Sequence, residues 1–363
     1  MKYSYNQKEI FPYVEYGISA VAYLSGIGMR DIFLNKQKCA YAWKTANEEL
    51  KKYFGNMLPT RKPEILTKYF CDFALIRKPV PPAISYGHLI SIGAPVTFPV
   101  DGEPNVSPFA HSVDEAIDIL KERKGKDFSE HEIFRHYLDI WDYLKQSFPE
   151  EEIPFVEFKA EGPITSAHSM RGEGFFYDIY DEPEKSREFL GLLSDSIIDF
   201  VKLCRKINGQ QEIQEGAYIA DDLASLMSPD MWGEFVIPFW KQIYEGLCNG
   251  KERCIHVENL VPEHLKYLKQ AEIAYYQPSV SPKITLESIK ENLDPGIAFD
   301  WMLTSFQIID MTEKQIEEWV DNTVHAGVTN IRTQFGDNTI RGKKLDRIEM
   351  FFKAFEKYRD SGS

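Results

Sequence analysis

Short apolar runs alternate with longer amphipathic segments through most of the chain. The apolar runs occupy residues 155–158, 213–219, 254–257, 273–276, 296–299 and 329–332. Between and after them, apolar positions three and four residues apart predict helices at 182–204, 228–247, 262–270, 285–293, 312–326 and 344–359. Because each predicted strand is followed by a helix-length crossover, the pattern predicts parallel βαβ units.

The number of these units favours one fold class. A succession of strand–helix units without a glycine-rich dinucleotide fingerprint is typical of a (β/α)8 TIM barrel rather than of a doubly wound sheet. Residues 1–70 differ, since segments such as 39–54 carry a helical pattern, whereas strand-like pieces begin at 73–76 and 88–92. We therefore expect a single α/β domain over 1–363, with a mostly helical N-terminal elaboration (1–70) and a barrel (71–363).

Charge and cysteine usage exclude several classes of partner. The chain has 42 basic and 56 acidic side chains, which give a net charge of −14, and this charge disfavours nucleic acid and anionic membrane surfaces. There is no long apolar span, no apolar leader and no C-x-x-C pair among the five cysteines. We expect reduced thiols and a cytoplasmic protein. Aromatic residues make up 13% of the chain, which is consistent with a thick core, a ring-binding pocket or a partner surface.

Polar or aromatic side chains follow nearly every apolar run. In a barrel the carboxyl ends of the strands form the active-site face, so these residues are expected to share one mouth. They are Glu161, Tyr218, Asp221, Asp222, His256, Glu258, Gln277, Asp300, Trp301, Gln334 and Phe335.

His256-Val257-Glu258 is the most specific of these groups. Residues two apart in a strand face the same side, so His256 and Glu258 could bind one ion. Imidazole and carboxylate are both zinc ligands, and a catalytic zinc has three protein ligands and an open position. The alternative is a hydrogen-bonded His–Glu pair without a metal.

Asp221 and Asp222 are adjacent, so only one of them can face the site squarely. The other is expected to cap a helix or to pair with a basic residue. A buried member would be a general acid or base, or would bind a cationic ring nitrogen. Capping alone explains the pair equally well. Together with Glu258, both aspartates are catalytic candidates.

Two further groups join a polar residue to an aromatic one. Asp300-Trp301 and Gln334-Phe335 could each place a hydrogen-bonding group beside a ring wall, which suits an aryl substrate. Each could also be an ordinary strand-end turn.

Several short motifs follow one another along the chain in an order that can be compared with known families. They are Gly162-Pro163-Ile164-Thr165, the stretch 172–184 that ends in Tyr180-Asp181-Glu182-Pro183-Glu184, Tyr218-Ile219-Ala220-Asp221-Asp222, the stretch 226–238, and Cys254-Ile255-His256-Val257-Glu258-Asn259. Over residues 150–360 they resemble the uroporphyrinogen decarboxylase superfamily, which also contains zinc-dependent methyltransferases that work with corrinoid proteins. The resemblance implies a (β/α)8 barrel with its site at the strand carboxyl ends.

The chain departs from both familiar branches of that superfamily. The decarboxylases hold substrate carboxylates with an N-terminal Arg-Gln-Ala-Gly-Arg run, which is absent here, and a polyanionic tetrapyrrole suits a net charge of −14 poorly. The thiol-directed methyltransferases carry His-x-Cys-Gly-Asn and a distant Cys. Here His256 matches the His and Glu258 replaces the Cys, while the region of Gln334 has no Cys. An oxygen-rich ligand set makes zinc a stronger Lewis acid, suited to an ether oxygen.

The resemblance therefore implies the methyltransferase component of a corrinoid-dependent system, acting on a small methylated substrate such as an aryl methyl ether. It implies zinc held by His256, Glu258 and either Asp300 or Asp222, and a corrinoid carried by a separate protein. Gln277 and Gln334 would bind the substrate, whose ring would be walled by Tyr218, Tyr276, Trp301 and Phe335. The alternatives are a metal-free decarboxylase of an aromatic or pyrrole carboxylate and a non-catalytic barrel that binds an aromatic ligand.

Overall fold

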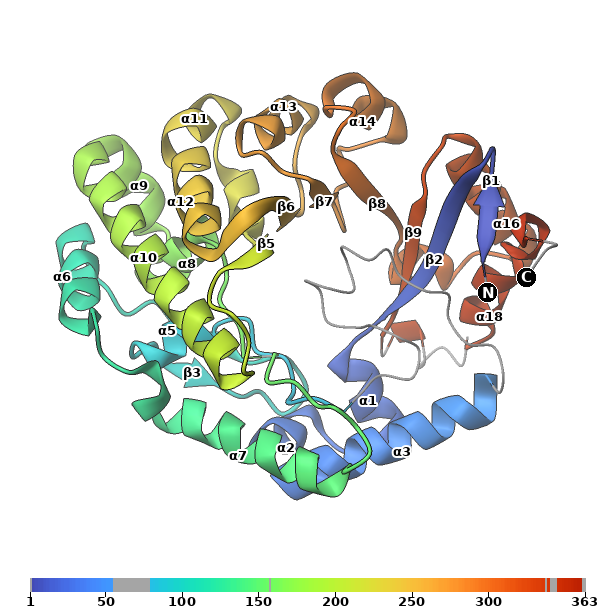
Figure 1. Cartoon of the computed structure of the whole chain (residues 1–363), viewed down its shortest axis with the longest axis horizontal. Coiled ribbons are helices and arrows are strands. Elements are labelled where there is room, and N and C mark those ends of the chain that lie inside the picture. The colour runs from blue at the N-terminus through green and yellow to red at the C-terminus, as the bar shows by residue number, and fades with distance from the viewer. Residues whose placement is uncertain (1, 55–78, 157, 337, 340–344, 361–363) are drawn as a thin grey trace. The chain divides into compact units, whose positions relative to one another are not determined.

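Parallel strands and the helices that connect them make up the computed structural model, which describes residues 2–54, 79–156, 158–336, 338–339 and 345–360. The chain divides into two compact units. The first unit contains residues 1–79, 277–280 and 299–363, and the second contains residues 80–276 and 281–298. Figure 1 labels the elements of both units.

The first unit is built on strands from the two ends of the sequence. β2 (Lys8–Tyr16) pairs in parallel with β9 (Asn330–Phe335), which pairs in parallel with β8 (Ala298–Leu303). β1 (Tyr3–Tyr5) lies antiparallel on the other side of β2 (Figure 1). The helices of this unit are α1 (Ile18–Ser25), α2 (Met29–Leu34), α3 (Lys36–Phe54), α15 (Ser305–Ile308), α16 (Glu313–His325) and α18 (Asp346–Lys353).

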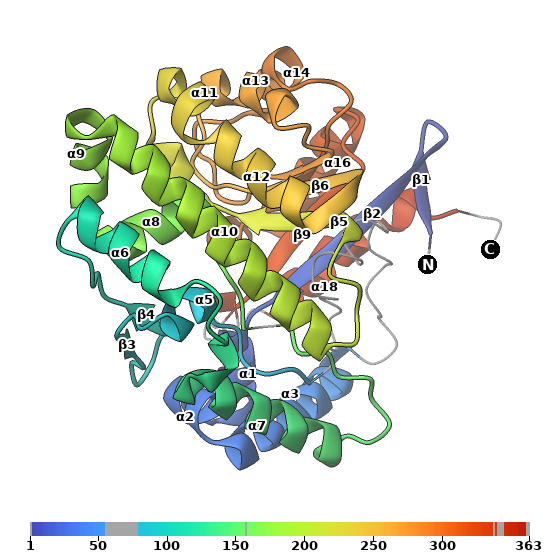
Figure 2. The ribbon, with the colours of Figure 1, turned by 60° about the vertical axis from the view of Figure 1, so that its left-hand side comes forward.

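The second unit holds the parallel pair β5 (Gln214–Ala220) and β6 (Cys248–His256), together with Tyr275 and Tyr276 of β7 (Tyr275–Gln277). Its longest helix, α10 (Pro183–Ile207), buries Leu190, Leu193 and Ile197 on one face. Figure 2 shows α10 lying across α6 (Val113–Arg123), α8 (Pro163–Arg171) and α12 (Ile237–Leu247). The other helices of the unit are α5 (Gly87–Ser91), α7 (Glu132–Ser147), α9 (Gly174–Asp181), α11 (Trp232–Phe235), α13 (Pro262–Gln270) and α14 (Leu286–Asn292).

The N-terminal third differs from the sequence pattern at two places. Residues 3–5 and 8–16 are strands within the region predicted to be mostly helical, because Ile10, Tyr13 and Val14 favour extended backbone and both β1 and β9 pair with β2. Residues 88–92 lie in helix α5 and at its end, where every side chain is buried, so no helical period shows in the sequence. The predicted strand at 73–76 and the boundary near residue 70 lie outside the described residues. Within the described segments, no helix has the length and apolarity to cross a membrane.

Candidate active site at the carboxyl ends of β5 and β6

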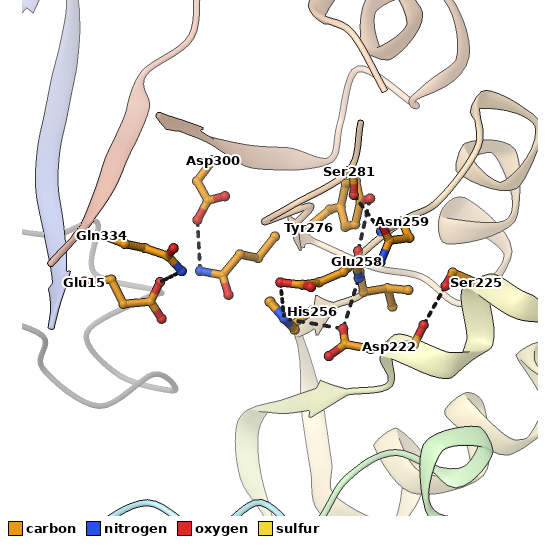
Figure 3. A network of polar contacts seen from close by, with 12 residues as sticks. Glu15, Asp222, Ser225, His256, Glu258, Asn259, Tyr276, Ser281, Asp300 and Gln334 are labelled. Atoms are coloured by element: carbon orange, nitrogen blue, oxygen red, sulfur yellow. Dashed lines mark hydrogen bonds and ion pairs between the residues drawn. The ribbon is translucent and has the colours of Figure 1, made fainter. Parts of the chain in front are cut away.

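The register of two neighbouring strands brings two polar segments of the second unit together. Ala220 at the end of β5 pairs with His256 at the end of β6. The segments that follow the two strands carry Asp221 and Asp222 in one case and Glu258 and Asn259 in the other. Figure 3 shows the resulting cluster, in which Asp222 and Glu258 point toward the imidazole of His256.

Two carboxylates flank one nitrogen of this histidine. His256 Nε2 lies 3.4 Å from Asp222 Oδ1 and 3.8 Å from Glu258 Oε1. The same Asp222 oxygen accepts a hydrogen bond of 3.0 Å from the backbone N–H of Glu258, which ties the two loops together. One residue on, Asn259 has a φ of 60°, and its N–H donates to Ser281 Oγ at 2.9 Å (Figure 3). Hydrogen bonds from the backbone N–H groups of Glu258 and Asn259 therefore position this loop. The side chains of Asp222, His256 and Glu258 are half-buried.

Asp221 has a different role from its neighbour. Its buried carboxylate accepts hydrogen bonds from the backbone N–H groups of Thr165 at 2.7 Å and Ile164 at 3.3 Å, and from Trp240 Nε1 at 2.7 Å. It therefore caps the N-terminus of α8. Burial raises the pKa of Asp221 to about 6, although these hydrogen bonds act in the opposite direction. A Cβ on Gly162 would lie 2.5 Å from the Asp221 side chain, so glycine is required at that turn.

Glu161 is a site residue that the sequence prediction left out of its catalytic set. It precedes the Gly162-Pro163 start of α8 and is half-buried. Surrounding protein displaces water from its carboxyl and, with the negative charges of Asp222 and Asp221, raises the pKa of Glu161 to about 8, although a hydrogen bond with Ser85 lowers it. Glu161 therefore carries a proton at neutral pH. The signal in the sequence was an acid three residues after the apolar run 155–158 and two residues before the start of a helix.

The donor types at His256 suit zinc, but their arrangement does not form a metal site. Across the described part of the chain, no three His, Cys, Asp or Glu side chains are grouped so that they could hold a metal ion. Within the second unit Asp222 is the further acid beside His256, and one of its oxygens is engaged by the Glu258 N–H. No part of the chemistry proposed below is therefore assigned to a metal.

Asp300, predicted as a zinc ligand, belongs to a buried ion-pair network in the first unit. Its Oδ2 accepts hydrogen bonds from Tyr13 at 2.7 Å and Gln277 Nε2 at 3.0 Å, and lies 3.1 Å from Arg332 Nε. Burial and the Asp300 charge raise the pKa of Tyr13, so its phenol stays a donor. Asp300 as a zinc ligand stays a prediction, and in the first unit its carboxylate is paired with Arg332.

Arg332 extends that network toward the carboxyl ends of the strands. It also pairs with Glu15, which accepts a 3.4 Å hydrogen bond from Gln334 Nε2 (Figure 3). Sequence reasoning missed both Arg332 and Glu15. The signal for Arg332 was an arginine inside an apolar run, at a position that must be buried.

The four aromatic side chains of the predicted ring wall fall into two groups. Tyr276 is fully buried, with its hydroxyl 3.4 Å from the carbonyl oxygen of Val257. Phe335 is buried against Tyr16, at 5.5 Å between ring centroids. Tyr276 and Phe335 are therefore buried, whereas Tyr218 and Trp301 are half-buried, and the ring wall stays a prediction. Apolar character at a strand end does not distinguish a lining ring from a packed one.

Parallel βα units with polar clusters at their strand ends define a TIM-barrel type of enzyme. The sequence profile of the family described as uroporphyrinogen decarboxylase (URO-D) matches residues 86–354, and the chain belongs to this family. A methyltransferase from Methanosarcina mazei has a similar structure, with a TM-score of 0.67 and 14% sequence identity over 96% of this chain and 94% of that one. The predicted family and barrel class are confirmed. A search of curated proteins finds no match.

Proposed function

We propose that the chain is a methyltransferase of the URO-D family that moves a methyl group from a small methylated substrate to a separate corrinoid protein. The observation that carries the proposal is the cluster around His256, in which one imidazole nitrogen lies within 4 Å of the carboxylates of Asp222 and Glu258. The family and the methyltransferase of similar structure support an enzyme of this general kind.

The charge of the cluster favours a methyl donor over a carboxylated substrate. Asp222 and Glu258 flank a single imidazole, and the negative charge of Asp222 contributes to the raised pKa of Glu161. Such a group would repel the carboxylates of a pyrrole or aryl acid. A neutral ether meets no such penalty. The decarboxylase alternative is therefore less favoured by the site.

In this proposal the side chains of the site donate a proton to the substrate and orient its oxygen. The corrinoid of the partner protein supplies the nucleophile that takes the methyl group. When the C–O bond of a methyl ether breaks, its electron pair stays on the substrate oxygen, which then needs a proton. Glu161 carries a proton at neutral pH and is our candidate acid. Asp222 and Glu258 fix the ring of His256, which would orient the substrate oxygen.

Zinc at His256 and Glu258 stays a prediction, resting on donor type and on the family resemblance. Elemental analysis of the purified chain tests it directly. If the wild type contains about one equivalent of zinc and His256→Ala contains none, His256 is part of a metal site. The side chains around it must then rearrange to bind the ion. Absence of zinc from an active preparation would assign the reaction to the side chains alone.

The proposed function is tested by methyl transfer from methoxybenzene-type ethers to free cob(I)alamin, followed by its absorbance. We expect turnover by the wild type and a loss of about 10²–10⁴-fold in His256→Ala, the range for a lost polar catalytic group. His111→Ala removes an exposed histidine and is the matched control, with unchanged turnover. Carbon dioxide release from a carboxylated substrate without a corrinoid would contradict the proposal.

A further inference from the structure

Exposed apolar side chains gather on one surface of the second unit. Tyr177, Tyr180 and Leu226 are 67%, 72% and 62% exposed, and Phe176 and Met231 lie with Tyr180 and Leu226 around one pocket of about 280 Å³. We call these five residues the α9 patch. α9 packs against α8 and α10, and both ribbon views show it at the periphery of its unit (Figures 1 and 2). Apolar surface of this kind typically marks an interaction site.

The patch is an ordered surface. The opposite face of α9 is anchored in the core by Phe175 and Ile179. On the exposed face, Tyr180 donates its hydroxyl to Met231 Sδ at 3.3 Å, which links α9 to the helical turn η3 (Pro229–Met231). The ring of Phe176 lies 5.5 Å from that of His168. These contacts join α9 to η3 and to α8.

Its composition indicates a protein partner. Tyrosine and methionine are enriched in protein–protein interfaces, and methionine adapts to the shape of a partner side chain. The pocket volume of about 280 Å³ suits a single large apolar side chain. Exposed acids lie at or next to the patch at Glu173, Asp181 and Asp230, so the complementary surface is an apolar side chain surrounded by basic residues.

The patch is continuous in sequence with the candidate active site. Leu226 is the last residue of η2 (Asp222–Leu226), whose first residue is the aspartate beside His256. Ser225 Oγ donates to the Asp222 carbonyl at 2.7 Å and holds this short turn (Figure 3). A protein seated on the patch therefore lies one helical segment from the cluster, where a methyl acceptor has to be delivered.

We infer that the α9 patch is the docking surface of the corrinoid protein, an inference that rests on the proposed methyl transfer. Docking on the patch would place a carrier beside the loop that carries Asp222. A small free corrinoid needs no such surface. A variant of the patch should therefore lower methyl transfer to the carrier protein without changing transfer to a free corrinoid.

The test compares two methyl acceptors, free cob(I)alamin and a purified, reconstituted corrinoid carrier protein. Tyr180→Asp places a charge at the centre of the patch. We expect transfer to the carrier protein to fall at least about 10-fold, the effect of about 1.4 kcal/mol of lost binding, while transfer to free cob(I)alamin is unchanged. Tyr177→Asp provides a second variant, and Tyr41→Asp, at an aromatic residue 56% exposed on α3, is the matched control.

Each outcome bears on one of the two proposals. If the wild type methylates neither acceptor, the proposed function fails. If Tyr180→Asp and Tyr177→Asp both transfer to the carrier protein as well as the wild type does, docking on the α9 patch is excluded while the function stands. Equal loss with both acceptors in both variants also contradicts docking. If light scattering shows that the wild type alone is a dimer that Tyr180→Asp dissociates, the patch is a self-association surface and the inference is wrong.

Discussion

At the scale of single residues, environment separates chemically equal side chains. Asp221 and Asp222 are neighbours in sequence, yet one caps α8 and the other lies beside His256. Glu161 is a third acid of the same segment of the fold, and it alone has a pKa raised to about 8. Their adjacency in sequence predicts that the side chains of Asp221 and Asp222 point in different directions. It could not predict which acid keeps a proton, because that depends on water displaced by residues distant in sequence.

Replacing Glu161 tests the proton at this site. The pKa of about 8 lies above the ordinary 4.5, so wild-type methyl transfer is expected to decline as pH rises through 8, where the acid loses its proton. Glu161→Gln should lower turnover by about 10²-fold and abolish that decline. The measurement is a pH–rate profile from pH 6 to 9 for both proteins. A variant that keeps the decline near pH 8 would show that another group titrates there.

The same shift predicts a stability effect with a defined sign. Between its ordinary pKa and about 8, the folded state binds a proton at Glu161 that the unfolded state releases. This contribution to folding is complete below about pH 4.5 and is lost as pH rises through 8. The melting temperature of the wild type should therefore fall relative to that of Glu161→Gln as pH increases from 5 to 9. A constant difference across this range would contradict the shift.

Arg332 tests the second polar cluster. It is fully buried between Asp300 and Glu15, so Arg332→Met leaves the buried carboxylate of Asp300 and the half-buried carboxylate of Glu15 without their cation. Breaking such a pair typically costs about 3–5 kcal/mol of unfolding free energy. The matched control is Arg359→Met, since its pair with Glu356 is half-exposed and expected to be worth below about 1 kcal/mol. Urea denaturation compares the two variants. Equal midpoints would mean that the buried pair contributes no net stability.

At the scale of elements, periodicity and capping signals located most of the fold. The predicted helix 262–270 has the bounds of α13, and the runs ending at Ile219 and Val257 contain most of β5 and part of β6. The failures have a physical cause. Residues 88–92 form a helix buried on all sides, and residues 8–16 become a strand because β9 pairs with them from the far end of the sequence. Such long-range pairing leaves no local signal.

Gly162→Ala tests the junction between β5 and α8. The added Cβ would lie 2.5 Å from Asp221 Cβ and Cγ, so the aspartate that caps α8 must shift. We expect a loss of about 1–3 kcal/mol in unfolding free energy, the usual cost of overpacking. Gly233→Ala is the matched control, because a Cβ there meets nothing within 4 Å and alanine favours the helix. A variant at 162 as stable as the wild type would show that Asp221 can move freely.

At the scale of the whole molecule, the net charge of −14 and the carboxylates around His256 act in the same direction. Both disfavour anionic substrates, the long-range field by repelling them during approach and the cluster by repelling them when bound. Family membership alone does not make this distinction, since it is compatible with a carboxylated substrate. Under the proposed function, charge is therefore the property expected to separate this chain from a decarboxylase of the same barrel.

Salt dependence separates the repulsion of anionic substrates by the net charge of the molecule from the repulsion by the carboxylates around His256. We expect KM for methoxybenzoate to exceed KM for methoxybenzene in the methyl-transfer assay at about 0.05 M salt. Raising salt to about 0.5 M shortens the screening length to a few ångströms, so repulsion by distant acids should fade and the gap should narrow. The part that remains at high salt is assigned to Asp222 and Glu258, and it should shrink in Asp222→Asn. Equal KM values at low salt would mean that a basic group counters these acids, and would reopen the case for a carboxylated substrate.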